Sequence, residues 1–196
     1  MKRHIIKFLV IAVIMFAATS AFADYSYNFD VNTSSLSGQT GYIDLQFNPG
    51  LSQGPASAVV TNFTSDATLG GAPAITGDVT GALPSTVVLN NSTGLNDYYQ
   101  AVTFGNTVDY SLNLSGAAGN SFALSFFAAD GSTPVLTTDM VNGFATTIDL
   151  NANGASVNNL SNQVSVSQTP IPAAAWLLGS GLTAMFGIRR RTMNIS

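Results

Sequence analysis

Apolar and polar residues alternate along the middle of this chain, which is the pattern of strands with one buried face. The alternation is regular over residues 25–31, 43–47, 108–114 and 122–126. No stretch between residues 24 and 168 sustains the period of a helix. Further short strands are expected where β-branched and aromatic residues gather, in segments 58–63, 75–80, 85–89, 98–104, 144–150, 157–160 and 164–166.

Turn residues separate these segments. Asn48-Pro49-Gly50, Asp130-Gly131 and Asn153-Gly154 are the clearest turn sequences. Strands therefore recur roughly every 10 to 14 residues, as in antiparallel all-β domains. Residues 24–168 are predicted to form one antiparallel β-sandwich with a jelly-roll-like topology, long enough to bury a core of its own.

The first 23 residues have the layout of a secretory signal peptide. A basic start, Lys2 to Lys7, precedes the uncharged apolar stretch Phe8–Ala18. Ala21 and Ala23 then satisfy the small-x-small rule for cleavage, so Asp24 is the expected mature N-terminus. The alternative is an anchor that stays uncleaved.

The last part of the chain has three features in order. Pro170 and Pro172 precede an uncharged apolar run, Ala173–Ile188, and Arg189, Arg190 and Arg191 follow it. As a helix the run would span roughly 24 Å, which is the short end of a membrane span. We expect a transmembrane helix over 173–188 and a cytoplasmic tail over 192–196, with the arginines holding that end in the cytoplasm. A buried core helix, the alternative, would show a polar face, and this run has none.

These residues carry a family resemblance. The motif Pro170-Ile171-Pro172, the apolar run with small residues and the cluster Arg189 to Arg191 resemble the PEP-CTERM sorting signal of Gram-negative bacteria, in its VPLPA variant. Thr169 stands where the variant usually has Val, and Ile171 stands where it has Leu. The resemblance covers residues 169–191. It implies that an exosortase, a membrane-embedded cysteine transpeptidase, removes the tail, much as the apolar tail of a GPI signal is removed.

The domain from Asp24 to Thr169 is similar to the ectodomains of a PEP-CTERM family of small β-rich proteins of unknown activity. The stretches 34–38, 46–50 and 77–81 carry this second likeness. It implies export and an all-β fold. In organisms with such signals, the resemblance also implies a link to exopolysaccharide and biofilm.

The two terminal segments predict the same topology. Both basic clusters would lie in the cytoplasm, and the domain between them would cross the inner membrane. The expected partners are therefore signal peptidase, an exosortase-like transpeptidase and, transiently, the inner membrane. The processed protein is expected at the cell surface or in the extracellular matrix.

Charge is distributed very unevenly. All six Lys and Arg residues lie in the terminal segments, the single His is His4, and all ten acids are Asp residues between Asp24 and Asp149. The mature domain would carry a formal charge of −10, which disfavours binding to nucleic acid. The chain has no Cys, so no disulfide stabilises it.

The missing residue types also restrict catalysis. Without Cys, Lys or His the domain can build neither a nucleophile–base pair nor a zinc site with His or Cys ligands. A pair of Asp residues could still serve a glycoside hydrolase. We expect no enzymatic activity, and the Asp-dependent glycosidase remains an open alternative.

One local motif has metal-binding spacing. Asp149, Asn151 and Asn153 fit the opening of a calcium loop, Asp-x-Asn-x-Asn-Gly. The twelfth position is Leu160, where such a loop needs Glu. A β-hairpin turn at Asn153-Gly154 explains the same residues without a metal. No cofactor other than calcium is expected.

Five tyrosines complete the candidate binding residues. They could stack on sugars or fill the core, and aromatic residues of strands more often do the second. They are Tyr25, Tyr27, Tyr98, Tyr99 and Tyr110. The favoured function is a non-enzymatic surface or matrix protein processed by an exosortase-like system. The alternative is a carbohydrate-binding module that uses a sandwich face and a calcium ion.

Overall fold

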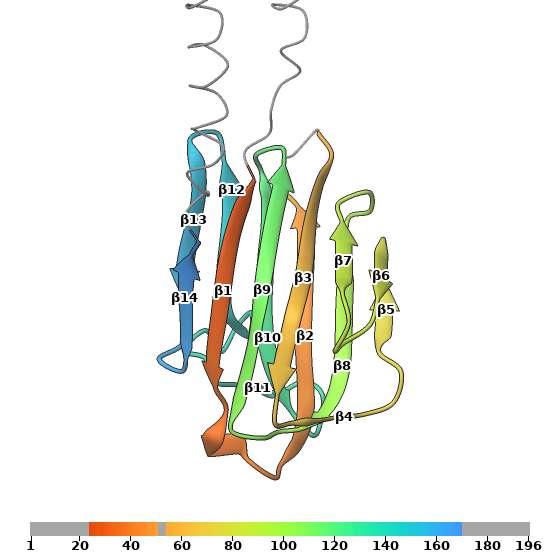
Figure 1. Ribbon diagram of the computed structural model, residues 1–196, viewed down its shortest axis with the longest axis vertical. Helices are drawn as coiled ribbons and strands as arrows, with labels where there is room; N and C mark the ends of the chain where they lie inside the picture. The colour runs from red at the N-terminus through yellow and green to blue at the C-terminus, as the bar shows by residue number, and fades with distance from the viewer. Residues whose placement is uncertain (1–23, 51–53, 170–196) are drawn as a thin grey trace, which may run out of the picture.

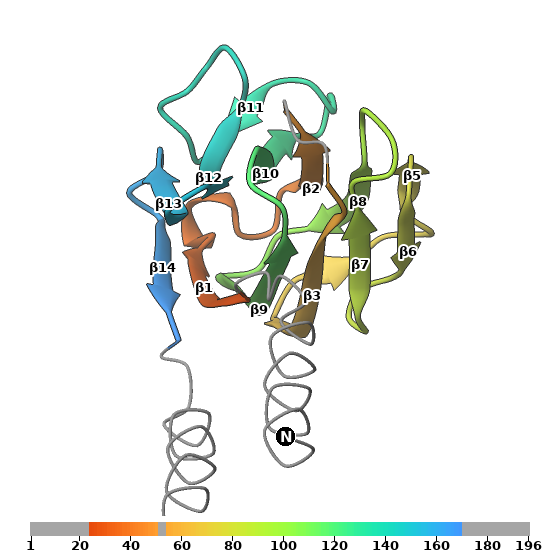
Figure 2. The same ribbon diagram turned by 90° about the horizontal axis from the view of Figure 1, so that it is seen from above.

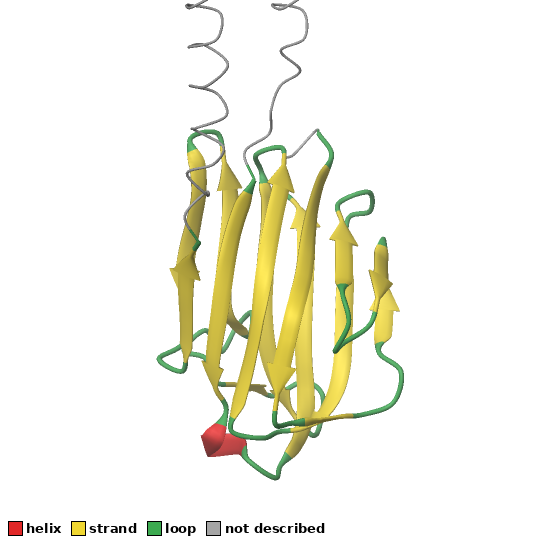
Figure 3. Cartoon of the chain, in the orientation of Figure 1, coloured by secondary structure: helices red, strands yellow, loops and turns green. Residues whose placement is uncertain are grey.

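The computed structural model describes residues 24–50 and 54–169. The predicted signal peptide, the motif at 170–172, the apolar run at 173–188, the arginines at 189–191 and the tail at 192–196 lie outside these residues. Within the described ranges, one 3-10 turn, Ser34–Leu36, stands among the strands (Figure 3), and no helix is long and apolar enough to span a bilayer.

The described residues form two antiparallel sheets. Sheet A has six strands in the order β14-β1-β9-β3-β7-β6, and sheet B follows the path β13-β12-β10-β2-β8-β4, with β11 added to β10 and β5 to β8. Figure 2 shows the two sheets facing each other as the layers of a sandwich. The predicted all-β antiparallel sandwich is therefore confirmed. The strands are β1 (Tyr25–Asn32), β2 (Thr40–Pro49), β3 (Ala56–Ser65), β4 (Thr68–Leu69), β5 (Ala74–Thr76), β6 (Val79–Gly81), β7 (Val87–Asn90), β8 (Asp97–Thr103), β9 (Thr107–Gly116), β10 (Asn120–Ala128), β11 (Pro134–Val135), β12 (Phe144–Asn151), β13 (Gly154–Asn159) and β14 (Val164–Gln168).

The core lies between the inner faces of the two sheets. Because side chains alternate across a strand, every second residue of β1, β2, β9 and β10 is buried there. Phe29 of sheet A meets Phe122 of sheet B edge to face, with ring centroids 6.0 Å apart, and stacks on Tyr110 at 4.5 Å. Burial of these large side chains stabilises the sandwich without disulfides.

Segment 75–80 differs from the prediction. The sequence predicts one strand there, whereas the chain forms β5, which pairs with β8 in sheet B, and β6, which pairs with β7 in sheet A. Gly77 separates them with a φ of 76°, a conformation that favours glycine. The amide of the next residue, Asp78, donates to Asn96 Oδ1 at 2.9 Å, which holds the crossing in place.

The two ends of the described domain lie side by side. The first strand, β1, pairs with the last strand, β14, with Tyr27 opposite Gln168. The amide of Thr169 extends this pairing by donating to the carbonyl of Ser26 at 2.8 Å. The chain therefore enters and leaves the sandwich at the same end, as Figure 1 shows for β1 and β14.

Candidate functional site

The outer face of sheet B carries an unusual set of polar side chains. In β2, Ile43, Leu45 and Phe47 point into the core, so Tyr42, Asp44 and Gln46 lie on the outer face. In the neighbouring strand β8, the same alternation puts the side chains of residues 97, 99 and 101 on that face. Two carboxyl groups and two tyrosines are thereby brought to adjacent strands.

Asp44 and Asp97 form a carboxyl pair at the centre of this face. Asp97 lies opposite Gln46, next to Asp44 along the β2–β8 ladder, and the two carboxyl groups are within hydrogen-bonding reach of each other. Asp44 is only 3% exposed. Burial, followed by the hydrogen bond and charge of Asp97, raises the pKa of Asp44 to about 8, against a lowering contribution from Gln46.

Three oxygen atoms of this site have no hydrogen-bond partner among the described residues. They are Oδ1 of Asp44, Oδ1 of Asp97 and Oγ of Ser125, and all three are buried. Ser125 of β10 lies directly opposite Asp44 of β2, so its side chain is on the same face. The other oxygen of Asp44, Oδ2, accepts a hydrogen bond from Gln46 Nε2 at 2.8 Å. One side of the Asp44 carboxyl group is thus fixed, and the other side has no donor.

No cationic side chain balances the pair. Lys, Arg and His are missing from the whole span 24–169 of the sequence. Buried carboxylates ordinarily have a cation, a metal or several hydrogen-bond donors beside them. Asp44 and Asp97 therefore either share a proton or require a cation from outside the chain.

Aromatic rings border the carboxyl pair. Tyr42 of β2 stacks on Tyr99 of β8, with ring centroids 4.6 Å apart and an angle of 19° between the rings. The ring of Phe127, which lies opposite Tyr42 on β10, is 6.0 Å from that of Tyr99. The Tyr99 hydroxyl donates to the carbonyl of Gly131 at 2.8 Å, which ties the β10–β12 connection to this face. Burial, then the Tyr42 hydroxyl and nearby carboxyl groups, raises the pKa of Tyr99 to about 12.

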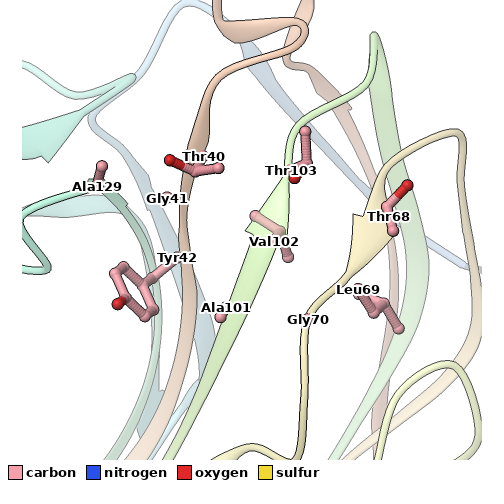
Figure 4. A pocket seen from close by; sticks show the side chains of 10 residues that line it. All are labelled: Thr40, Gly41, Tyr42, Thr68, Leu69, Gly70, Ala101, Val102, Thr103 and Ala129. Carbon is pink, nitrogen blue, oxygen red and sulfur yellow. The ribbon is translucent and has the colours of Figure 1, made fainter.

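A pocket of about 230 Å³ adjoins the stacked tyrosines. Figure 4 shows it between β2, β8 and β4, with Tyr42 and Ala129 on one side and Leu69 on the other. Its lining is uncharged and mostly apolar, and three threonines contribute hydroxyl groups that can hydrogen-bond. The lining residues are Thr40, Gly41, Tyr42, Thr68, Leu69, Gly70, Ala101, Val102, Thr103 and Ala129.

The residues predicted for a calcium loop form a β-hairpin. Asp149 and Asn151 belong to β12, and Asn153 is in the two-residue turn before β13. Asp149 Oδ2 accepts from Asn158 Nδ2 at 2.9 Å, and Asn151 Nδ2 donates to Ser156 Oγ at 2.8 Å. A β-hairpin is therefore confirmed at this position, although its two turn residues are Ala152 and Asn153 and not the predicted Asn153-Gly154, because Gly154 already pairs with Asn151. Calcium at this position stays a prediction.

The predicted tyrosines divide between core and surface. Tyr27, Tyr98 and Tyr110 are buried in the core, whereas Tyr25 and Tyr99 are half-buried. Sequence reasoning missed Tyr42 as the partner of Tyr99. The alternation in 42–47 contains the signal, since it puts Tyr42 and Asp44 on the face opposite to the core.

A second acidic pair lies on the outer face of sheet A. Asp30 of β1 is directly opposite Asp109 of β9. Burial, then the hydrogen bond and charge of Asp30, raises the pKa of Asp109. Asp30 is exposed and Asp109 is half-buried, so water reaches this pair far more than it reaches Asp44.

Of the predicted processing residues, only Asp24 is described, as an exposed residue just before β1. Ala21 and Ala23 of the signal cleavage site, Pro170, Ile171 and Pro172 of the sorting motif, and the three arginines lie outside the described residues.

Comparison with known proteins gives no family for this chain. No protein-family model, curated protein or solved structure matches it. The likeness of residues 169–191 to a PEP-CTERM signal therefore stays a prediction, and any function must be argued from composition and geometry.

Proposed function

We propose that this chain is an exported, non-enzymatic surface or extracellular-matrix protein. In this proposal signal peptidase removes residues 1–23, an exosortase-like transpeptidase removes the sorting signal at 169–191, and the sandwich associates with exopolysaccharide. The observation that carries the proposal is the pairing of β1 with β14. Because the chain enters and leaves at one end, a domain attached by both termini to one membrane can fold without strain on either connection.

The composition of the domain supports a role without catalysis. Span 24–169 lacks the Cys, Lys and His residues on which most nucleophilic and general-base chemistry depends. Glycoside hydrolases hold their two carboxyl groups about 5 Å or more apart, because the glycosidic bond lies between them. The pairs Asp44–Asp97 and Asp30–Asp109 are each within hydrogen-bonding reach, which is too close for that geometry.

The strand order supports the jelly-roll-like topology within this proposal. In sheet A the order β1-β9-β3-β7 alternates early and late strands, and in sheet B the order β2-β8-β4 does the same. Successive strands from β1 to β3 thus fall in alternate sheets. This is the wrapping pattern of a jelly roll, to which β10, β12, β13 and β14 add further strands.

The sorting proposal is tested by substitutions in the native host. Replacement of Pro170 and Pro172 by Ala, or of the three arginines by Ala, should leave an uncleaved precursor in the membrane fraction. Ile171→Leu, which restores the commoner residue of the motif, is the matched control and should be processed normally. A mature product of unchanged mass from both the proline and the arginine variants would refute the proposal.

A carbohydrate-binding module is the second candidate function, and the Tyr42–Tyr99 stack beside the pocket favours it. Aromatic faces beside hydroxyl-bonding groups are suited to sugar rings. Tyr42→Ala should then reduce saturable binding to the host's own polysaccharide, while Tyr25→Ala on sheet A should not. Wild-type protein that shows no saturable binding would remove this candidate and leave the sorting proposal intact.

A further inference from the structure

We propose that the edge strand β13 is a self-pairing surface, through which two copies of this chain join antiparallel into one continuous sheet. β13 ends sheet B, and among the described strands it pairs with β12 alone. At six residues, Gly154–Asn159, it is the longest strand at an end of either sheet within the described ranges. This inference goes beyond the proposed function, which does not concern self-association.

The first argument is the direction of the backbone groups of β13. The Leu160 amide donates to the carbonyl of Ala145 at 2.9 Å, so these opposite residues form a hydrogen-bonded pair. Bonded and non-bonded pairs alternate along an antiparallel ladder, and therefore the N–H and C=O groups of Ala155, Val157 and Asn159 point away from β12. No described strand pairs with this second edge. A free edge of this kind is a template for a further strand.

The second argument is that β13 lacks the features that usually prevent strand pairing. Native edges are commonly protected by charged residues or by Pro, and β13 has neither. Val157 lies opposite the buried Ile148, on the core side of the sheet, yet it is 39% exposed. The edge of β14 in sheet A is partly covered, because Asn159 Nδ2 donates to the carbonyl of Val164 at 2.6 Å. A strand added to β13 would cover Val157 and extend the buried face.

The third argument identifies the partner strand as β13 of a second copy. The outward-facing residues are evenly spaced, so β13 can pair with itself about its Val157. The two Val157 residues would then lie opposite each other, and Ala155 of each copy would lie opposite Asn159 of the other. On the outer face, Ser156 would lie opposite Asn158. Such a contact is isologous, because both copies contribute the same surface.

Charge does not prevent this pairing at physiological ionic strength. Asp149 is the one acidic residue of the β12–β13 hairpin. In the pair, the two copies of Asp149 would be separated by three strand spacings, roughly 14 Å. This separation exceeds the Debye length of about 8 Å. The domain still carries a formal charge of −10, so pairing should strengthen as salt is added.

The pairing inverts one copy relative to the other. Within each copy, the β12–β13 hairpin lies at the end where the chain enters and leaves the sandwich (Figure 1), and a Cβ atom on Gly154 would lie 3.9 Å from the Tyr25 hydroxyl oxygen. Because the two β13 strands run antiparallel, these ends point in opposite directions. Two precursors held by their termini in one membrane cannot pair in this way, so pairing follows release of the domain. This last consequence, unlike the pairing itself, rests on the proposed function.

Disulfide trapping in the full chain, purified in detergent, tests the pairing, and the chain has no Cys of its own. Ser156→Cys mixed with Asn158→Cys should give a mixed disulfide dimer well above the statistical ratio of random pairing. The reason is that opposite residues of a non-hydrogen-bonded pair have Cα atoms about 4.5 Å apart, within the range of disulfides. Mass spectrometry identifies the mixed dimer. Ser165→Cys mixed with Ser167→Cys, the matched control on edge strand β14, should give only the low yield of random collisions.

Sedimentation of the chain without added Cys gives an independent readout. Monomer and dimer should interconvert with concentration, and the dimer fraction should rise between about 20 mM and about 300 mM NaCl as repulsion is screened. Val157→Lys should weaken dimerisation by about tenfold or more, since two like charges would lie opposite each other. Val157→Ile, the matched control, should pair like the wild type.

Three outcomes would overturn the proposal. One is a mixed dimer of Ser156→Cys and Asn158→Cys that is no more abundant than the β14 control. Another is a Val157→Lys chain that associates like the wild type. The third is preferred trapping of Ser165→Cys with Ser167→Cys, which would place the association on sheet A. None of these results bears on the processing of the two termini, which mass analysis tests separately.

Discussion

Tyr98 and Tyr110 are both buried in the core, but their hydroxyl groups have different surroundings. The Tyr98 hydroxyl accepts from the amide of Leu83 at 2.9 Å and donates to Gln100 Oε1 at 3.0 Å. The Tyr110 hydroxyl has no hydrogen-bond partner among the described residues, and burial raises the pKa of Tyr110 well above its usual value. The Tyr98 hydroxyl therefore stabilises the fold through its hydrogen bonds, whereas burial of the Tyr110 hydroxyl costs desolvation energy without a compensating bond.

Substitution by phenylalanine separates the two cases. Tyr98→Phe should lower the free energy of unfolding by about 1–2 kcal/mol, because Leu83 and Gln100 lose a partner. Tyr110→Phe should change it little or raise it slightly, since no bond is broken. Urea unfolding of the two variants measures the difference. Equal losses would mean that the Tyr110 hydroxyl has a partner after all.

The carboxyl pair predicts a pH dependence. The folded-state pKa of Asp44 is raised from 3.8 to about 8, so between these values the unfolded state holds fewer protons than the folded state. Stability should therefore fall as pH rises from about 4 to about 8. The loss should be on the order of a few kcal/mol, at about 1.4 kcal/mol per pKa unit.

Asp44→Asn tests this dependence, because the amide does not titrate. The free energy of unfolding of this variant should vary less with pH than that of the wild type, and at pH 8 it should exceed the wild-type value. Urea unfolding between pH 5 and pH 8 gives both curves. Curves that run parallel over this range would show that Asp44 does not carry the pH dependence.

At the scale of the element, β2 is an interior strand of sheet B, because β10 and β8 flank it on both edges. Gly41 stands where β2 begins to pair with β10. A Cβ atom at Gly41 would overlap the carbonyl oxygen of Phe127 and the ring of Phe104. The strand therefore needs glycine here for close approach, not for an unusual φ.

Gly41→Ala should lower the free energy of unfolding by about 1–3 kcal/mol or more, because the core must shift to admit the methyl group. Gly71→Ala is the matched control, since nothing lies within 4 Å of its added Cβ. The control should stay within about 0.5 kcal/mol of the wild type. Urea unfolding measures the free energy of unfolding of both variants. An equal loss of stability in Gly41→Ala and Gly71→Ala would show that close packing at Gly41 does not cause the loss.

The sequence predicted the long strands well because alternation is a local property. It predicted β1, β8, β9, β10 and the β12–β13 hairpin close to their observed positions. It did not find β4 or β11, each of two residues, because such short strands form only where a neighbour offers an edge. It also merged β5 and β6, since the crossing at Gly77 depends on Asn96, which is distant in sequence.

At the scale of the whole molecule, the candidate site could not be predicted from local sequence patterns. Asp44, Asp97 and Ser125 look like ordinary polar residues of alternating strands, and only the order of β8, β2 and β10 brings them together. The composition nevertheless indicates one property of the site, which is that its carboxyl groups have no basic side chain beside them. A span without Lys, Arg or His cannot pair a buried carboxyl group with a base of its own.

The first and last strands of the described domain put its two ends together at one end of the sandwich. This arrangement suits a domain that crosses the membrane between an N-terminal signal peptide and a C-terminal sorting signal. The central claim is that both segments are removed and that the sandwich acts outside the inner membrane.

Intact mass, with peptide mapping of both termini of the protein from its native host, tests this claim most directly. We predict a chain that begins at Asp24 and ends between Thr169 and Ala173. A chain that retains Arg189, Arg190 and Arg191 would contradict the claim. It would show that residues 173–188 are a permanent anchor and that the sandwich stays attached to the inner membrane.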